Sequence, residues 1–347
     1  FCLSRGLGDV YKRQVLICDR ELERMEFIKA EYWDLIAEHV EQKIPFESRI
    51  VRYKKQKIAV GKDFEDKTGK LSPNVENTIV ITKELATQIK KEIEGKDFEL
   101  FSIEEKPLSR KPAPPFITST LQQEASRKLG LSSKEAMRVA QSLYENGLIT
   151  YMRTDSPSLS VDALNLSRDF ISKNYGKDFL PAEPRIYSSK SKSAQEAHEA
   201  IRPSGDFLEP SKTGLGGIDY KVYDLIWKRT IASQMSDAKM KQSQLQFQIG
   251  DCVFQANGSM ISFPGFLKVY DDSHNEDGQT EKKSSDVILP TLHKGDKIKA
   301  KKLDTYYHET KPVARFTEAS LVQTLEKLGV GRPSTYASII KTLVDRE

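Results

Sequence analysis

The strongest constraint on the fold is a hydrophobic period that changes twice along the chain. Residues 48–110 alternate polar and apolar side chains in short runs, which is typical of strands, and the alternation returns over 238–309. Between them, residues 111–237 repeat apolar side chains at helical spacing. We therefore predict a multidomain α+β fold, in which a mainly helical domain is inserted between two β-rich parts that pair across the insertion.

The remaining segments complete this plan. Residues 15–47 are predicted to be a helical segment with a helix that runs to about Ile28, and residues 310–347 are predicted to form two helices around a glycine and proline turn. The proline-rich residues 108–120 predict an extended linker that enters the helical domain. The polar stretch 271–286 is predicted to be a surface loop.

The clearest predicted helix lies in the sequence SSKEAMRVAQSLYENG. Ser132 and Glu135 have the spacing of a capping box, and Gly147 is a terminator. A second helix is predicted to have Ser160 as its N-cap. The predicted apolar face of the first helix consists of Ala136, Val139, Ala140, Leu143 and Tyr144.

Residues 1–14 need separate treatment. Their end, DVYKRQ, back-translates as GATGTGTATAAGAGACAG, which resembles the end of a transposon-based sequencing adapter. We interpret residues 1–14 as a sequencing artefact and exclude them from the fold prediction, although they also fit a native basic loop. On the first interpretation the chain is a fragment of a longer protein, truncated within 310–347.

Composition excludes several classes of protein. With 347 residues, 38% hydrophobic and 30% charged, the chain is long enough for several domains and unlike a disordered protein. No apolar run approaches the roughly 18 residues of a membrane span. Cys2, Cys18 and Cys252 are scattered, so they predict neither disulfides nor a zinc site and favour a cytoplasmic setting. The net charge of +4 is only weakly compatible with a nucleic-acid partner.

The stretch GLITYMRTDS, residues 147–156, ends a predicted strand. In an extended segment residues i and i+2 project from one face, so Tyr151, Arg153 and Asp155 are predicted to share a face. About 0.1% of a free tyrosine is phenolate near pH 7, so a nucleophilic tyrosine needs a neighbouring base or cation. A planar guanidinium can bind two phosphate oxygens. The stretch therefore fits a tyrosine nucleophile, or an ordinary strand end.

Two further stretches carry residues suited to phosphate. In SAQEAHEAIRPS, residues 193–204, His198 and Arg202 lie four apart and would share a helix face, although a solvated helix face is an alternative. In GVGRPSTYASII, two glycines permit close backbone approach and Arg332 adds charge, although a plain helix connection is an alternative. The predicted helix start in that stretch consists of Pro333, Ser334 and Thr335.

Together, and in this order, GLITYMRTDS, AQEAHEAIRPS and RFTEASLVQTLEKLGVGRPSTYASII resemble motifs of the bacterial type IA DNA topoisomerases of the topoisomerase I kind. The resemblance covers about residues 15–347. It implies an incomplete toroid in which the β-rich parts form an arch and the inserted domain is a lid that bears the tyrosine. Residues 15–47 and 310–347 would then be helical base segments.

The resemblance also implies an activity. Tyr151 would attack single-stranded DNA, leaving a 5′-phosphotyrosine and a free 3′-hydroxyl, and resealing after strand passage would relax negative supercoils without ATP. Arg153 would hold the scissile phosphate, and His198 would lie near the site as a third catalytic residue that assists DNA binding and closure. The expected protein is a bacterial, cytoplasmic, nucleoid-associated monomer. The residues expected to line the DNA groove or support the tyrosine are Gln141, Glu145, Thr150, Thr154, Asp155, Arg202, Arg332, Ser334 and Thr335.

The sequence departs from the family in one respect that bears on a cofactor. The family has an N-terminal acidic domain with an Asp-x-Asp metal cluster, and no Asp-x-Asp occurs in this chain. Mg²⁺ is expected for the intact enzyme, but its ligands are absent here, and we expect no relaxation by this chain alone.

Two alternatives to this function differ in how well the residues fit them. A tyrosine recombinase needs His-x-x-Arg, whereas Ile201 stands at that arginine position. A non-catalytic module that binds single-stranded DNA through basic and aromatic side chains remains the main alternative.

Overall fold

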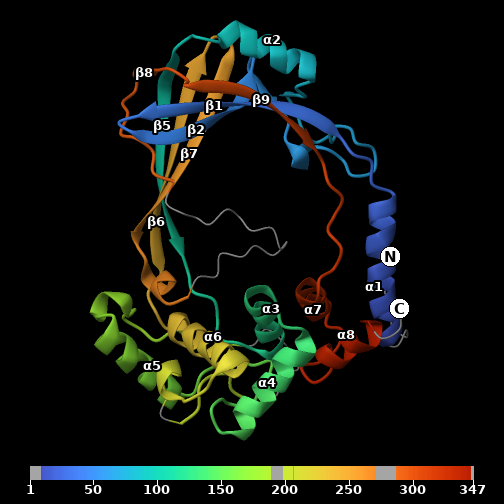
Figure 1. The fold of residues 1–347 in the computed structure, drawn as a ribbon, viewed down its shortest axis with the longest axis vertical. Helices are drawn as coiled ribbons and strands as arrows, with labels where there is room; N and C mark the ends of the chain where they lie inside the picture. The colour runs from blue at the N-terminus through green and yellow to red at the C-terminus, as the bar shows by residue number, and fades with distance from the viewer. Residues whose placement is uncertain (1–8, 189–197, 206, 271–286, 345–347) are drawn as a thin grey trace.

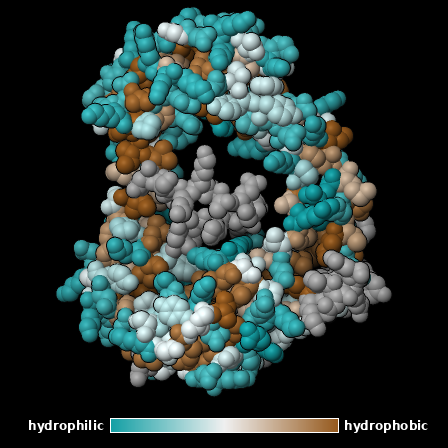
Figure 2. Space-filling model, in the orientation of Figure 1, coloured by the Kyte–Doolittle hydropathy of each residue, from teal (hydrophilic) through white to brown (hydrophobic). Residues whose placement is uncertain are grey.

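The chain runs around a central opening in the computed structural model, which describes residues 9–188, 198–205, 207–270 and 287–344 (Figure 1). A β-sheet forms an arch on one side of the opening, and a group of helices lies on the other side. The space-filling view shows the opening between them and mostly hydrophilic residues on the outer surface of the arch (Figure 2).

The arch is one mixed sheet in which nearly all neighbouring strands are antiparallel. The strand order is β4-β3-β2-β7-β6-β5-β8, and β1 pairs with both β2 and β9. The strands are β1 Glu31–Glu41, β2 Ile44–Tyr53, β3 Gln56–Ile58, β4 Thr78–Ile79, β5 Phe98–Arg110, β6 Ala238–Ile249, β7 Cys252–Phe263, β8 Lys297–Ile298 and β9 Lys302–Glu309.

The helices fall into three groups. α2 covers one end of the arch, α3 to α6 form a helical block between β5 and β6, and α1, α7 and α8 lie on the remaining side of the ring (Figure 1). The helices are α1 Asp9–Met25, α2 Lys83–Ile93, α3 Thr118–Leu129, α4 Ser133–Glu145, α5 Val161–Asn174, α6 Gly217–Ser233, α7 Glu318–Lys327 and α8 Tyr336–Val344. Short 3₁₀ turns occur at Gly61–Asp63, Lys177–Phe179, Pro210–Lys212 and Gly265–Lys268.

Strand pairing across the helical block confirms the predicted insertion. β5 pairs with β6 along almost its whole length and ends in register at Arg110 and Ala238. β2 pairs with β7, and β1 pairs with β9 in the same way. The helical block is therefore connected to the arch through two adjacent strand ends.

Each part of the ring has a hydrophobic core of its own. Phe98, Phe247 and Phe254 are fully buried in the arch, whereas Phe116 and Tyr223 belong to the core of the helical block. A third, smaller cluster joins α7 and α8 and includes Leu16 of α1. Hereafter α7, α8 and the loop between them are called the terminal block.

The prediction that 15–47 is helical is wrong beyond Met25, because Glu31–Glu41 is strand β1. The segment EYWDLIAEHV has apolar residues that fit both periods and is rich in aromatic and β-branched side chains. Pairing with β2 on one edge and β9 on the other decides in favour of a strand. The linker is also shorter than predicted, since β5 extends to Arg110 and α3 begins at Thr118.

Other sequence predictions have mixed outcomes. The capping box of Ser132 and Glu135, the N-cap Ser160 and the two terminal helices are confirmed. Tyr144 was placed on a buried helix face, but it is 40% exposed. The predicted loop 271–286 lies outside the described residues. Residues 9–14 form part of α1, which does not test whether residues 1–14 are a sequencing artefact. Within the described part of the chain, no helix is long and apolar enough to span a membrane.

Candidate active site

The segment from Thr150 to Ser156 joins no sheet, and its backbone bends at Thr150, Met152 and Arg153 instead of forming the predicted strand end. Met152 and Thr154 are buried, whereas Tyr151 and Arg153 are exposed and Asp155 is partly exposed. Exposed and buried residues therefore alternate as predicted, and Tyr151, Arg153 and Asp155 are the more exposed members of the segment.

Thr118, at the start of α3, holds this segment in place through hydrogen bonds to its backbone. Its hydroxyl donates to the Met152 carbonyl at 2.7 Å and accepts from the Thr154 N–H at 2.9 Å. The Thr118 N–H donates to the Thr154 carbonyl at 2.9 Å. A fully buried threonine thus fixes the backbone on both sides of Arg153.

The second motif holds the same segment from the other side, but not as a helix. Residues 198–204 are extended, with isolated bridges from Ile201 to Phe116 and from Pro203 to Ile149. The prediction that His198 and Arg202 share a helix face is therefore wrong. The backbone N–H groups that a helix would use are engaged by distant partners: the Ile201 N–H, for instance, donates to Phe116.

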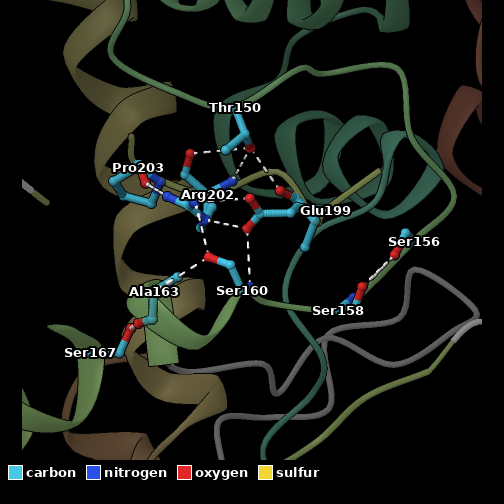
Figure 3. A network of polar contacts seen from close by, with 10 residues as sticks. Thr150, Ser156, Ser158, Ser160, Ala163, Ser167, Glu199, Arg202 and Pro203 are labelled. Atoms are coloured by element: carbon cyan, nitrogen blue, oxygen red, sulfur yellow. Dashed lines mark hydrogen bonds and ion pairs between the residues drawn. The ribbon is translucent and has the colours of Figure 1, made fainter. Parts of the chain in front are cut away.

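Arg202 is engaged within the protein (Figure 3). Its guanidinium donates to both carboxylate oxygens of Glu199 at 2.8 and 3.0 Å, to the Pro203 carbonyl at 2.8 Å and to the Ser160 hydroxyl at 3.3 Å. Burial by itself raises the pKa of Glu199, but the bonds from Arg202 and Ser160 outweigh it and hold the pKa below its usual value. The Arg202 backbone also exchanges hydrogen bonds with Thr150 at 2.9 and 3.0 Å.

A cavity of about 850 Å³ is lined by the exposed side chains of the segment from Thr150 to Ser156. It lies between the helical block and the terminal block, and both contribute side chains. Its lining residues are Tyr144, Tyr151, Arg153, Asp155, His198, Arg332, Pro333 and Ser334.

Two aromatic rings flank Tyr151 in this cavity. The ring centroids of Tyr144 and His198 lie 5.4 and 5.6 Å from that of Tyr151. Tyr151 is 38% exposed, so solvent in the cavity reaches this residue. Arg153 forms no ion pair with the described residues, which leaves its guanidinium available for an anion.

The terminal block contributes the loop between α7 and α8. Gly329 and Gly331 have φ of +66° and +90°, a region that favours glycine. Thr335 closes the loop: its hydroxyl accepts from the Arg332 N–H at 2.8 Å, and its own N–H donates to the Arg332 carbonyl at 2.8 Å. The helix begins at Tyr336, after the predicted start, so Ser334 remains in the loop and lines the cavity.

The structure thus brings together Tyr151, Arg153, Asp155, His198, Arg332 and Ser334 from the predicted set. Gln141 and Glu145 do not line the cavity and form a hydrogen bond to each other at 2.6 Å. The side chains of Thr150, Thr154, Arg202 and Thr335 form hydrogen bonds to backbone groups instead. Tyr144 was not predicted as a site residue, because helical spacing alone placed it with the core.

A second cavity of about 830 Å³ adjoins the first and shares Asp155, Arg332 and Pro333 with it. Burial, together with the Asp155 carboxylate, raises the pKa of Glu326 there. Burial also raises the pKa of Tyr336 to about 12, with Glu326 and Asp155 adding to the effect. The carboxylates of Glu326 and Asp155 therefore repel each other where the terminal block meets the helical block.

The described residues do not fit the Mg²⁺ that the resemblance implies. No three of their His, Cys, Asp or Glu side chains are grouped so as to hold a metal ion. Asp155 is the one carboxylate among the residues that line the first cavity.

Comparisons with known proteins agree in what they find. The family described as DNA topoisomerase matches residues 15–347. DNA topoisomerase 1 of Synechocystis sp. is 48% identical over 332 residues, which is 95% of this chain and 37% of that protein. DNA topoisomerase 1 of Streptomyces coelicolor is 46% identical over 346 residues, 95% of this chain and 36% of that protein.

A solved structure has the same arrangement. Full-length topoisomerase I from Thermotoga maritima has a TM-score of 0.75 and 30% identity, over 98% of this chain and 51% of that one. The chain spans about 37% of the length of the first curated relatives it matches.

Proposed function

The chain belongs to the bacterial type IA DNA topoisomerase family, and from that premise we propose that it cleaves and reseals single-stranded DNA through Tyr151. The observation that carries the proposal is the cavity in which Tyr151, Arg153 and His198 face Arg332 and Ser334 of another block. A nucleophile, cations for a phosphate and an opening to solvent occur there together.

In the proposed cleavage step, the Tyr151 hydroxyl oxygen attacks the phosphorus of a phosphodiester. A bond forms between that oxygen and phosphorus, and the bond from phosphorus to the 3′ oxygen breaks. The phenol loses a proton and the departing 3′ oxygen gains one, so the protons balance. Arg153 and Arg332 lie on opposite sides of the cavity and stabilise the negative charge on the phosphate oxygens.

Resealing is the reverse step. The 3′-hydroxyl attacks the phosphotyrosine and releases Tyr151, so the phosphodiester is restored without ATP. We propose that passage of another strand between the two events relaxes negative supercoils. His198 packs beside the Tyr151 ring and assists DNA binding near the phosphate.

The other predicted residues receive proposed roles from their positions. Gln141 and Glu145 extend the DNA contact along α4, next to Tyr144. Thr150, Thr154, Arg202 and Thr335 form side-chain hydrogen bonds to the backbone segments that present the catalytic residues. By analogy with the bacterial relatives, we propose that the whole protein acts as a monomer on chromosomal DNA in the cytoplasm. The Mg²⁺ that it would use is bound by residues other than those described here.

The test uses an oligonucleotide labelled at its 3′ end, because the 5′-phosphate side stays on the protein. The chain is mixed with it, alone and together with the N-terminal domain of a full-length relative, and then denatured in detergent. A labelled band at protein size is expected, and it should disappear in Tyr151→Phe. Tyr144→Phe is the matched control, since that tyrosine lines the same cavity.

Two results would contradict the proposal. A band that persists in Tyr151→Phe would assign the chemistry to another residue. Salt-dependent DNA binding without a band in either mixture would leave the alternative function, a non-catalytic module for single-stranded DNA.

A further inference from the structure

The side chain of Glu318 crosses from α7 to the start of α4. Its Oε2 atom accepts a hydrogen bond from the backbone N–H of Ser133 at 2.6 Å. Ser133 is buried, and the two residues are far apart in sequence. The bond therefore joins the terminal block directly to the helical block.

Local sequence explains why this N–H group is available. In the capping box, the Ser132 N–H donates to the Glu135 carboxylate at 3.1 Å, and the Glu135 N–H donates to the Ser132 hydroxyl at 3.2 Å. The Ser133 N–H belongs to the first helical residue and has no acceptor within the helix. The positive end of α4 favours an anion there, and Glu318 also lies in the first turn of α7, next to the positive end of that helix.

The contact lies at the first turns of α4 and α7, and the cavity is lined from the other end of each helix, by Tyr144 in the last turn of α4 and by the loop after α7. α3 packs on α7, and α4 packs on α8. The helical block supplies Tyr151 and Arg153 to the cavity, and the loop that follows α7 supplies Arg332 and Ser334. Because α7 leads directly into that loop, the placement of α7 against the helical block sets the separation of these two groups.

The rest of this interface contains polar groups. Ser119 of α3 lies beside Glu326 of α7. Gln122, one turn further along α3, is fully buried, and neither of its amide atoms has a hydrogen-bond partner among the described residues. Such groups regain hydrogen bonds to water when the interface separates, which makes separation less costly.

We propose that Glu318 is a positioning residue that holds the terminal block against α4 and so keeps Arg332 and Ser334 opposite Tyr151. Without its bond to Ser133, the terminal block moves away from the helical block. The effect on DNA cleavage rests on the proposed function, whereas the effect on the separation of the blocks does not.

The test measures the distance between the blocks by pulsed electron resonance. One spin label is placed on Cys18, which is exposed on α1, and the other on Val161→Cys, which starts α5 and is 71% exposed in the native chain. Cys2→Ser removes another thiol, and the thiol of Cys252 is buried. The Cys18 label reports the terminal block because Leu16 of the same helix packs in its cluster.

Glu318→Ala is expected to shift the distance distribution and to lose its narrow component. Glu318→Gln retains an acceptor oxygen and should restore most of that component. Ser133→Pro removes the donor instead, and proline suits the first position of a helix, so it should reproduce the Ala result. The matched control is Glu84→Ala, an exposed first-turn glutamate on α2 in the arch.

An unchanged distribution in both Glu318→Ala and Ser133→Pro would overturn the proposal. So would a double variant that shifts the distance much further than either single change, because the two changes remove the same bond. If the distances shift but the native chain forms no covalent adduct with DNA, alone or with the N-terminal domain of a relative, the proposed function fails and the role of Glu318 in positioning stands.

Discussion

Replacing Thr118 by valine tests whether one hydroxyl holds the segment from Thr150 to Ser156 in place. Thr118 is fully buried, and its hydroxyl serves the Met152 carbonyl and the Thr154 N–H. Valine keeps the shape but leaves both backbone groups buried without that partner. Each such group costs about 1–3 kcal/mol, so the helical block should lose at least about 2 kcal/mol of stability.

A matched control comes from α6. Thr230 is equally buried, but its hydroxyl donates at 2.8 Å to the carbonyl of Ile226, one helical turn earlier. That carbonyl already accepts the helical N–H bond. Thr230→Val therefore leaves no backbone group unpaired, and its cost should stay below about 1 kcal/mol.

Urea unfolding followed by tryptophan fluorescence can separate the two variants. The chain has two tryptophans, Trp33 in the arch and Trp227 in the core of the helical block. In a Trp33→Phe background the signal reports the helical block. Thr118→Val should lower the midpoint more than Thr230→Val and reduce adduct formation by Tyr151. Equal midpoints would refute the argument.

Two further predictions concern the arch. Burial lowers the pKa of His39 from its ordinary value of 6.5 to about 4, so the unfolded chain binds a proton more readily than the folded one. The free energy of unfolding should therefore fall as pH drops from 6.5 towards 4, by up to about 3 kcal/mol. Urea unfolding followed by the fluorescence of Trp33, in a Trp227→Phe background, can measure this fall. The fall should be smaller when His39 is replaced by Gln. Gly265→Ala should unfold the region where β6 begins, because a Cβ at this φ of +48° would lie 2.3 Å from the Asp237 carbonyl oxygen. Gly250→Ala, at a φ of +54° with open space, should cost less, and thermal unfolding that ranks the two equally would contradict the steric argument.

Sequence patterns predicted the features that depend on neighbours within a few residues. Ser132 and Glu135 form the capping box that their spacing indicates, and the alternation of exposed and buried residues places Tyr151, Arg153 and Asp155 on one side of their segment as predicted. The inserted block was also predictable, since a change of hydrophobic period is visible in a single sequence.

Features that depend on distant partners were not predictable in this way. Residues 198–204 fit a helix by spacing, but their backbone partners lie near Phe116 and Thr150. Nothing local to Tyr144 distinguishes a side chain that faces a cavity from one that faces the core. Glu318 has the sequence of an ordinary first-turn glutamate, and its bond to Ser133 appears only in the folded chain.

The pairing of Arg110 with Ala238 also has a consequence for how the protein is made. β5 leaves the ribosome long before its partner β6, because residues 111–237 are synthesised between them. Residues 111–237 contain core residues such as Phe116 and Tyr223, so they can fold before β6 is available to pair with β5. That early collapse shortens the loop that must close when β6 arrives, so the order of synthesis and the topology of the sheet favour the same folding route.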